Sequence, residues 1–596
     1  MNNQHSERLK AVRAEMGRLN IDAFIVPHED EYFLEEVPEH NNRLKWLNGF
    51  TGTVGVAVVL KETAIIFVDG RYKVQVSEQV DEQQYYFQNL SEFEKHDWLG
   101  KALSTKSRIG LDPKLHTFAW YNEFVQACTL YQVTCVDIAK NIIDQCWKDR
   151  PHKKSKPVEI LADKYHGKPN KIKRTQTGDA LKASNVDCAI ITSLDSISWL
   201  LNLRGRDVPC LPVFFSTAII NKNGDVICFL ALENITENII SSFDCGVSFK
   251  AEQERDKYFL SLTNQVIQVD PQKVNADTMN VLRNNSNTIV ESLDPISLFK
   301  AQKNVIELSG FKACHLRDAS AVVNFLAWLD DNINSKVFYD EAVLSNKLES
   351  YRMKDALYQQ PSFETVSASG SNAAMCHYNH KDSIPKLMTN NSIYLIDSGA
   401  HYLDGSTDVT RTVAIGKVSS EQKRMATLVL KGHISLAQMK FPYGTTGQHL
   451  DAFARQYLWQ HGYDYAHGTG HGVGHYLNVH EGPQRIAKFN SEVALLPGMV
   501  VSIEPGYYRE SEFGIRHENL YFIKESKALA GAEIPMLAFE VLTHVPFDQS
   551  LIDNNLLSQS EINWLNNYHQ QVYTYISPLV HDTSSINWLR SATMAI

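Results

Sequence analysis

Apolar positions in the first quarter of the chain recur with alternating helical and strand periods. Such alternation is typical of α/β domains, in which short apolar strands lie between amphipathic helices. The pattern predicts a helix at 7–19, a strand at 22–27, a β-hairpin at 55–60 and 63–68, and a helix opened by the sequence DGRY at 69–72. The longest apolar run, Leu211–Ile220, predicts a buried strand, because it is much shorter than a membrane span.

Two segments of this first part are echoed further along the chain. IDAFIVP (21–27) resembles VDCAIIT (186–192), and RLKWLNGFTG (43–52) resembles SISWLLNLRG (196–205), although the spacing within the two copies differs. We interpret the echo as a duplicated α/β domain, with chance similarity between generic strands as the alternative. The lysine-rich stretch Pro151–Arg174 predicts a solvated linker rather than a binding patch.

Longer helices and clearer strands follow in the second half. Helical patterns are expected at 305–329, 421–440 and 447–460, and strands at 392–399, 408–416, 499–504 and 514–523. In the tail, Ser558 and Glu561 form a capping box, flanked by Leu557 and Ile562 as a hydrophobic staple. The helix that follows has an apolar face, which must be covered by the rest of the chain or by a second subunit. The expected domains are 1–155, 156–303, 304–546 and a helical tail at 547–596.

Composition and charge narrow the class of protein. The chain has 596 residues, of which 43% are apolar and 21% charged, and its net charge is −10, which is typical of a globular protein. No long Lys/Arg run is present, so we expect no nucleic-acid partner. No apolar signal segment opens the chain and no stretch approaches the roughly 18 apolar residues of a transmembrane helix, so we expect a cytoplasmic protein without a membrane partner. The nine cysteines are scattered and form no CxxC pair, which fits reduced thiols in a cytoplasm rather than a disulfide framework or a thiolate zinc site.

Four acidic residues lie where apolar side chains are expected in strands. Asp397 ends one predicted strand, Asp408 opens the next, Glu504 ends a third, and Glu518 lies within a fourth. Each alone could be a strand-end carboxylate in solvent. If they converge, each pair of charges about 4 Å apart repels by roughly 4 kcal/mol at an effective dielectric near 20, so the cluster needs cations. Carboxylates with one or two imidazoles suit divalent Mn, Zn, Co or Fe.

A histidine-rich segment, HGTGHGVGHYLNVHEGP (467–483), carries four histidines and five glycines in seventeen residues. Histidines four apart could share one face of a helix, but glycine at every second position makes a stable helix unfavourable. A loop that delivers one imidazole to a metal and others to its surroundings fits the segment better, because glycines allow a close approach of the backbone. The alternative is a histidine-rich surface loop.

In this order, the motifs DSGAHYLDGSTDVTRT, GTGHGVG, SIEPGYY and GIRHEN resemble those of the dinuclear "pita-bread" metallopeptidases, which include aminopeptidase P, prolidase and methionine aminopeptidase. The resemblance implies two creatinase-like N-terminal α/β domains followed by an α+β pita-bread catalytic domain. A duplicated N-terminal domain, the length of the chain and its short tail resemble the three-domain cytosolic aminopeptidases P.

The resemblance also implies roles for individual residues. Asp397 would bind one metal, Asp408 and Glu518 would bridge both, and His471 and Glu504 would complete the other. The catalytic residues would be His377 (in MCHYNH), His480 and Glu504, and the substrate-binding residues His377, His467, His480 and Arg516. His475 matches no such position, and His517 is expected to point away from the metals because side chains alternate along a strand.

The function implied is that of a metal-dependent exopeptidase that removes the N-terminal residue from peptides with proline second. A hydroxide that bridges two divalent ions would attack the bond before proline. Mn is favoured because four of the five ligands are carboxylates, with Zn or Co as alternatives. The resemblance also implies a homodimer. The rival functions are a prolidase, which cleaves dipeptides only, and a non-catalytic pita-bread scaffold, which typically lacks metal ligands that are intact here.

Overall fold

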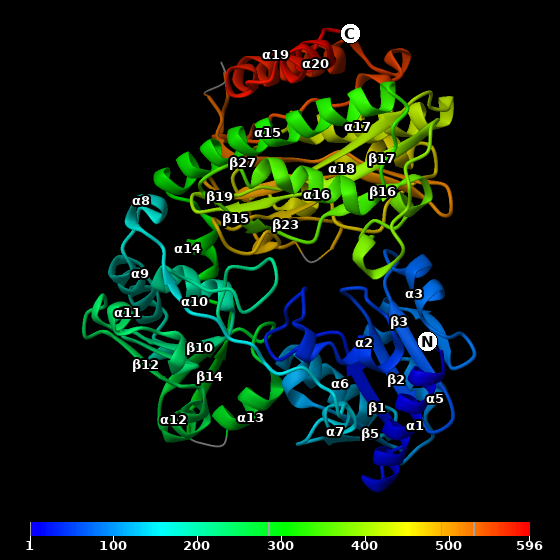
Figure 1. Ribbon diagram of the computed structural model, residues 1–596. Helices are drawn as coiled ribbons and strands as arrows, with labels where there is room; N and C mark the ends of the chain where they lie inside the picture. Colours follow the sequence, from blue (N-terminus) through cyan, green and yellow to red (C-terminus); the bar gives the residue numbers. More distant parts are fainter. Residues whose placement is uncertain (1, 284–285, 490, 528–530) are drawn as a thin grey trace. The chain divides into compact units, whose positions relative to one another are not determined.

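The computed structural model describes residues 2–283, 286–489, 491–527 and 531–596 (Figure 1). The chain divides into two compact units, one formed by residues 1–160 and 169–296, the other by residues 161–168 and 297–596. The limits of the four predicted domains stay a prediction. Within the described residues, no helix is both long and apolar enough to cross a membrane.

The first sheet of the N-terminal unit has the strand order β4-β3-β2-β1-β5-β6. Its strands are β1 (Ala23–Pro27), β2 (Val56–Leu60), β3 (Ala64–Val68), β4 (Tyr85–Asn89), β5 (Arg108–Leu111) and β6 (Thr134–Asp137). The predicted strand and hairpin are confirmed within one residue. Helix α1 (Asn2–Arg18) begins five residues before the predicted start, and α3 (Lys73–Gln79) follows DGRY as predicted.

The second sheet repeats this topology with the order β12-β11-β10-β8-β13-β14. Its strands are β8 (Cys188–Ile191), β10 (Ser216–Asn221), β11 (Val226–Leu230), β12 (Val247–Ala251), β13 (Val266–Val269) and β14 (Thr288–Glu291). In both sheets the third strand runs antiparallel to its two neighbours, and every other pairing is parallel. The two echoed apolar segments are β1 and β8, so matching strand order and direction support a duplicated domain.

Two predictions for this unit are wrong in part. The apolar run 211–220 forms a strand only from Ser216, and residues 212–215 belong to no strand. Pro212 has no N–H to donate to the hydrogen bonds of a sheet, which disfavours a strand there. The lysine-rich stretch is not solvated at its end, since α9 (Asn170–Ala183) buries both Lys173 and Arg174. Lys173 donates to Trp199 O and to Asn202 Oδ1 at 2.9 and 2.6 Å.

The second unit is built around two sheets that carry the predicted motifs. The order β16-β17-β20 joins β16 (Val366–Ser369), β17 (Ser392–Ser398) and β20 (Val409–Ile415). The order β21-β28-β27-β24-β22-β23 joins β21 (Lys440–Pro442), β28 (Met536–Val541), β27 (Asn519–Glu525), β24 (Val500–Ile503), β22 (Gly470–Gly472) and β23 (Glu481–Ile486). The predicted helices are confirmed as α15 (Val305–Asn334), α17 (Ser420–Ala437) and α18 (Gly447–Trp459).

The predicted strand 514–523 is interrupted. Phe513–Arg516 forms β26, which pairs with β25 (Gly506–Arg509), whereas Asn519–Glu525 forms β27 and pairs with β24. Glu518 lies at this interruption, where its backbone N–H donates to Thr410 O at 3.2 Å. The glutamate is therefore at a change of sheet partner rather than in the middle of one strand.

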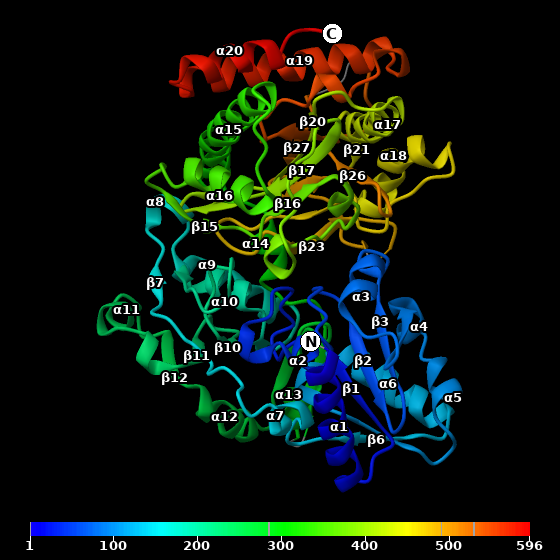
Figure 2. The same ribbon diagram turned by 45° about the vertical axis from the view of Figure 1, so that its right-hand side comes forward.

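The tail folds back onto its own unit. Ser558 caps α19 (Gln559–Ile576) and its hydroxyl accepts from Glu561 N, so the predicted capping box is confirmed. Leu565, Tyr568 and Val572 are buried in one core with residues of α15, α16 (Glu341–Arg352), β17 and α17. Figures 1 and 2 show α19 and α20 (Thr583–Ala592) lying over α15. The apolar face is thus covered within the chain, and its need for cover no longer supports a second subunit.

Candidate metal centre

Strand pairing brings the four acidic residues together. Asp397, on β17, is the register partner of Thr410, so it lies beside Asp408, the residue that precedes β20. Strands β24 and β27 are antiparallel, and Ile503 pairs with Asn519. Glu504 follows Ile503 and Glu518 precedes Asn519, so the two glutamates lie side by side. Three sets of three ligand atoms then lie within 4.8 Å of one another: His471 with Glu504 and Glu518, Asp397 with Asp408 and Glu518, and Asp408 with His471 and His480.

His471 reaches the carboxylates from β22 in a fixed orientation. Its Nδ1 donates to the carbonyl oxygen of Gly472 at 2.9 Å, so the proton of the neutral ring lies there and Nε2 keeps a free lone pair. Nε2 lies 3.4 Å from Glu504 Oε1 and 3.5 Å from Asp408 Oδ2. Ser502 links His471 to Glu504, because its hydroxyl accepts a hydrogen bond from His471 N and donates one to Glu504 Oε1.

Two carboxylates of the cluster are buried, and two of its carboxylate oxygens lack a hydrogen-bond donor among the described residues. Asp408 and Glu518 are almost fully buried, and Oδ1 of both Asp397 and Asp408 accepts no hydrogen bond from any described residue. Burial raises the pKa of Asp408 to about 6, and burial together with the charges of Asp408 and Glu504 raises the pKa of Glu518 well above its usual value. Buried carboxylate oxygens without donors are costly, and divalent ions remove that cost, so the residues present fit a pair of such ions.

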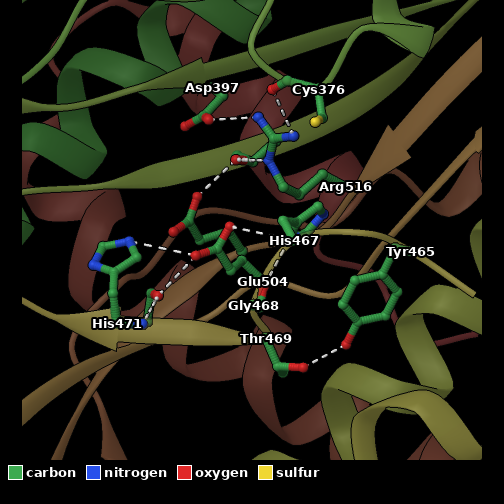
Figure 3. Close-up of polar contacts among 12 residues, drawn as sticks. Cys376, Asp397, Tyr465, His467, Gly468, Thr469, His471, Glu504 and Arg516 are labelled. Carbon is green, nitrogen blue, oxygen red and sulfur yellow. Dashed lines mark hydrogen bonds and ion pairs between the residues drawn. The ribbon is translucent and has the colours of Figure 1, made fainter. Parts of the chain in front are cut away.

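Arg516 donates four hydrogen bonds to protein groups. Its Nη2 donates to Asp397 Oδ2 at 2.5 Å, and its Nη1 donates to Tyr508 OH and to Cys376 O at 2.7 and 3.2 Å. Figure 3 shows the Arg516 guanidinium between Asp397 and Cys376. The Nε of Arg516 donates to Thr410 Oγ1, which itself donates to Glu518 Oε2 at 2.7 Å. Substrate binding by Arg516 stays a prediction, and the contacts observed are those of a residue that orients two carboxylates.

The other predicted histidines differ in how close they come to the cluster. The ring of His480 is edge-on to that of His471, with centroids 4.4 Å apart, and a ring nitrogen lies within ligand distance of Asp408 and His471. His467 donates from Nδ1 to Gly468 O at 2.7 Å, and its Nε2 is 2.8 Å from Tyr508 OH. His377 is half-buried in the loop after the short helix Gly370–Ala374, directly after Cys376.

The two histidines without an expected role lie in apolar surroundings. His475 is buried edge-on to Phe311, with ring centroids 5.6 Å apart. His517 packs edge-on against Phe547, and burial lowers its pKa to about 3, which keeps the ring neutral.

Sequence reasoning missed the hydroxyl and phenol groups that hold the ligands. Ser502 and Thr410 each stand two residues from a predicted ligand on the same strand, so strand alternation alone places them on the same side. Tyr508 lies in the SIEPGYY motif and contacts both Arg516 and His467, but nothing in its sequence position reveals that contact.

Comparison with known proteins agrees with this geometry. Residues 309–525 match metallopeptidase family M24 and residues 535–596 the C-terminal region of that family, while residues 8–146 and 149–307 each match the creatinase/prolidase N-terminal domain. A protein of Talaromyces marneffei named probable Xaa-Pro aminopeptidase P is 38% identical over 99% of this chain and 92% of its own length. One of the same name from Laccaria bicolor is 35% identical over 98% and 92%.

A solved structure matches over the whole chain. The X-prolyl aminopeptidase of Caenorhabditis elegans, described as a cytosolic enzyme with a di-nuclear active site, superimposes with a TM-score of 0.95 at 34% identity, covering 99% of this chain and 100% of its own.

Proposed function

This chain belongs to metallopeptidase family M24, among the Xaa-Pro aminopeptidases, and from that premise we propose that it removes the N-terminal residue of peptides whose second residue is proline. The predicted fold class, two creatinase-like α/β domains and an α+β pita-bread domain, is confirmed. The observation that carries the function is the convergence of Asp397, His471 and Glu504 on the buried carboxylates of Asp408 and Glu518, with Oδ1 of Asp397 and of Asp408 lacking a donor among the described residues.

The centre would hold two divalent ions, as the di-nuclear active site of the related Caenorhabditis elegans enzyme supports. We infer that Asp397 would hold one ion, that His471 and Glu504 would hold the other, and that Asp408 and Glu518 would be shared. Glu518 belongs both to the set of ligand atoms that contains Asp397 and to the set that contains Glu504. Asp408 Oδ2 lies 3.5 Å from His471 Nε2, and Asp408 also lies beside Asp397. Mn is our preferred ion because the set is rich in hard carboxylate oxygens, with Zn and Co as alternatives.

When bound, such ions supply a water that ionises near neutral pH and a Lewis acid for the carbonyl. Glu504, held by Ser502, accepts the proton of the attacking water. His480, beside His471, stabilises the negative charge that develops on the carbonyl oxygen before proline. His377 is given the same role, and His467 a role in substrate binding, by the family resemblance. Proline lacks an N–H and restricts the residue before it, so a site shaped for the imide excludes ordinary amides.

The decisive test compares substrates on protein stripped of metal and then reloaded with Mn²⁺. We expect release of the first residue from a Xaa-Pro-Yaa tripeptide, restored by Mn²⁺, and much slower cleavage of the dipeptide Gly-Pro. Preference for Gly-Pro would favour the prolidase alternative. Binding of proline peptides without cleavage at any metal content would favour the non-catalytic scaffold, and full activity after rigorous metal removal would contradict the function.

We also propose that the protein is cytosolic and forms a homodimer through its C-terminal half, with a complete active site in each subunit. The support is the family resemblance, together with the cytosolic description of the Caenorhabditis elegans enzyme. Light scattering tests the assembly: a mass near twice 67.5 kDa is expected, and 67.5 kDa at all concentrations would mean a monomer.

A further inference from the structure

A buried arginine on α18 holds the loop that carries His467. The Arg455 side chain is 1% exposed, and its Nη2 donates to the backbone oxygen of His467 at 2.8 Å. Its Nη1 donates to the backbone oxygen of Tyr465 and to Asp464 Oδ1, both at 2.8 Å. The guanidinium also lies over the Tyr465 ring, 3.8 Å from its centroid. One side chain therefore binds the loop at Asp464, Tyr465 and His467.

Asp451, one turn earlier on the same helix, extends the hold toward the metal ligands. Its Oδ2 accepts from Arg455 Nε and its Oδ1 from Thr469 Oγ1, both at 2.6 Å. The Thr469 hydroxyl also meets Tyr465 OH at 2.5 Å, as Figure 3 shows. The backbone oxygen of Thr469 accepts from Glu504 N at 2.8 Å, and His471 follows two residues later. The network thus reaches two proposed ligands through the backbone.

The glycines of this segment make it costly to order, which is a reason for neighbouring elements to hold it. Glycines occupy 468, 470, 472 and 474, and glycine loses the most conformational freedom on folding. Gly470 is required by close contact, since a Cβ there would stand 2.0 Å from Ser502 O. With four glycines that make no side-chain contacts, the segment takes its position from Thr469, from α18 and from pairing with β23 and β24.

We propose that Arg455 and Asp451 are positioning residues that set the geometry of the ion site formed by His471, Glu504 and Glu518. This inference rests on the proposed function for the identity of the ligands. Asp397 and Asp408 stand on β17 and before β20, outside this network, and Arg516 orients Asp397. Loss of the network should therefore weaken one of the two ion sites and leave the other.

The test uses the full-length protein with Arg455→Met, Arg455→Lys and Asp451→Asn. Thr469→Val removes only one hydroxyl and serves where the arginine variants fail to fold. Lys431→Met is the matched control, because it breaks a largely buried ion pair with Glu561, 2.6 Å long, between α17 and α19 in the same unit. Each protein is stripped of metal, examined by amide hydrogen exchange, and titrated calorimetrically with Mn²⁺.

In metal-free Arg455→Met, exchange should rise at residues 464–472 and at the Glu504 amide but not in β17. One Mn²⁺ step should weaken at least tenfold while the other changes less than twofold, and kcat should fall more than KM rises. Arg455→Lys should recover part of this loss and Lys431→Met should show none of it. Equal weakening of both steps, or unchanged exchange in the loop, would overturn the proposal. If the wild type binds no Mn²⁺, the proposed function fails, and the exchange data still decide whether the network holds the loop.

Discussion

Asp408 shows at the scale of one residue how the metal centre opposes folding. Burial raises its pKa to about 6 from an ordinary 3.8, and Glu518 shifts in the same direction. A carboxyl whose pKa is higher in the folded than in the unfolded state binds its proton more tightly when folded. Metal-free protein should therefore lose stability as pH rises from about 4 to about 6. Metal-loaded protein should gain affinity for its ions across the same window, because protons compete with them.

The pH prediction is checked by urea unfolding of metal-free wild type and Asp408→Asn between pH 4 and 8. The asparagine cannot ionise, so its advantage over the wild type should grow as pH rises through the window and then stay constant. The same variant should lose nearly all Mn²⁺ binding and activity. A constant stability difference between the two proteins at all pH values would contradict a raised pKa at Asp408.

His480 has two possible roles, as a metal ligand or as a group that stabilises the developing oxyanion, and a substitution distinguishes them. The resemblance places it outside the metal ligands, whereas a ring nitrogen lies within ligand distance of Asp408 and His471. If it stabilises the developing oxyanion, His480→Ala should lower kcat by roughly 10²-fold while two metals per chain remain. His377→Ala should behave in the same way. Elemental analysis decides, because loss of one metal in His480→Ala would make it a ligand.

At the scale of elements, the tail helix α19 is a structural part of the catalytic unit. Leu565 is fully buried in the core shared with α15, α16, β17 and α17, so Leu565→Ala should lower the free energy of unfolding by about 2–5 kcal/mol. Ser558→Ala removes a capping hydroxyl and should cost only about 0.5–2 kcal/mol. Chemical denaturation measures both. Near-zero cost at Leu565 together with a change in oligomeric mass would show that the tail instead mediates assembly.

Prediction from sequence succeeded where the signal was local. Asp397, Asp408 and Glu504 lie at or beside strand ends as their flanking residues indicate, and Ser558 caps its helix as the local pattern predicts. It failed where a distant partner decides. The strand around Glu518 is split because its halves pair with different strands. Lys173 can be buried because Trp199 O and Asn202 Oδ1, 26 and 29 residues further along the chain, accept hydrogen bonds from its ammonium group. Arg455 was missed for another reason: its pair with Asp451 has an ordinary i,i+4 helix spacing, and its bonds to the backbone oxygens of Tyr465 and His467 depend on how the loop after α18 folds.

At the scale of the whole molecule, the two units should respond differently to metal. All five proposed ligands belong to the unit formed by residues 161–168 and 297–596. A ligand that binds only the folded state stabilises it by about 2.7 kcal/mol at a hundred times its dissociation constant. Added Mn²⁺ should therefore raise the unfolding temperature of the catalytic unit and leave that of the N-terminal unit unchanged.

Differential scanning calorimetry of metal-free protein, with and without excess Mn²⁺, should then show one endotherm that moves and one that does not. In Asp408→Asn neither endotherm should move with Mn²⁺. The endotherm that moves in the wild type but not in this variant is therefore that of the catalytic unit. The N-terminal unit has its own sheets and cores, which gives it the means to unfold separately. A common shift of both endotherms would mean that the two units unfold as one cooperative body, and no shift in the wild type would mean that the five residues do not bind Mn²⁺.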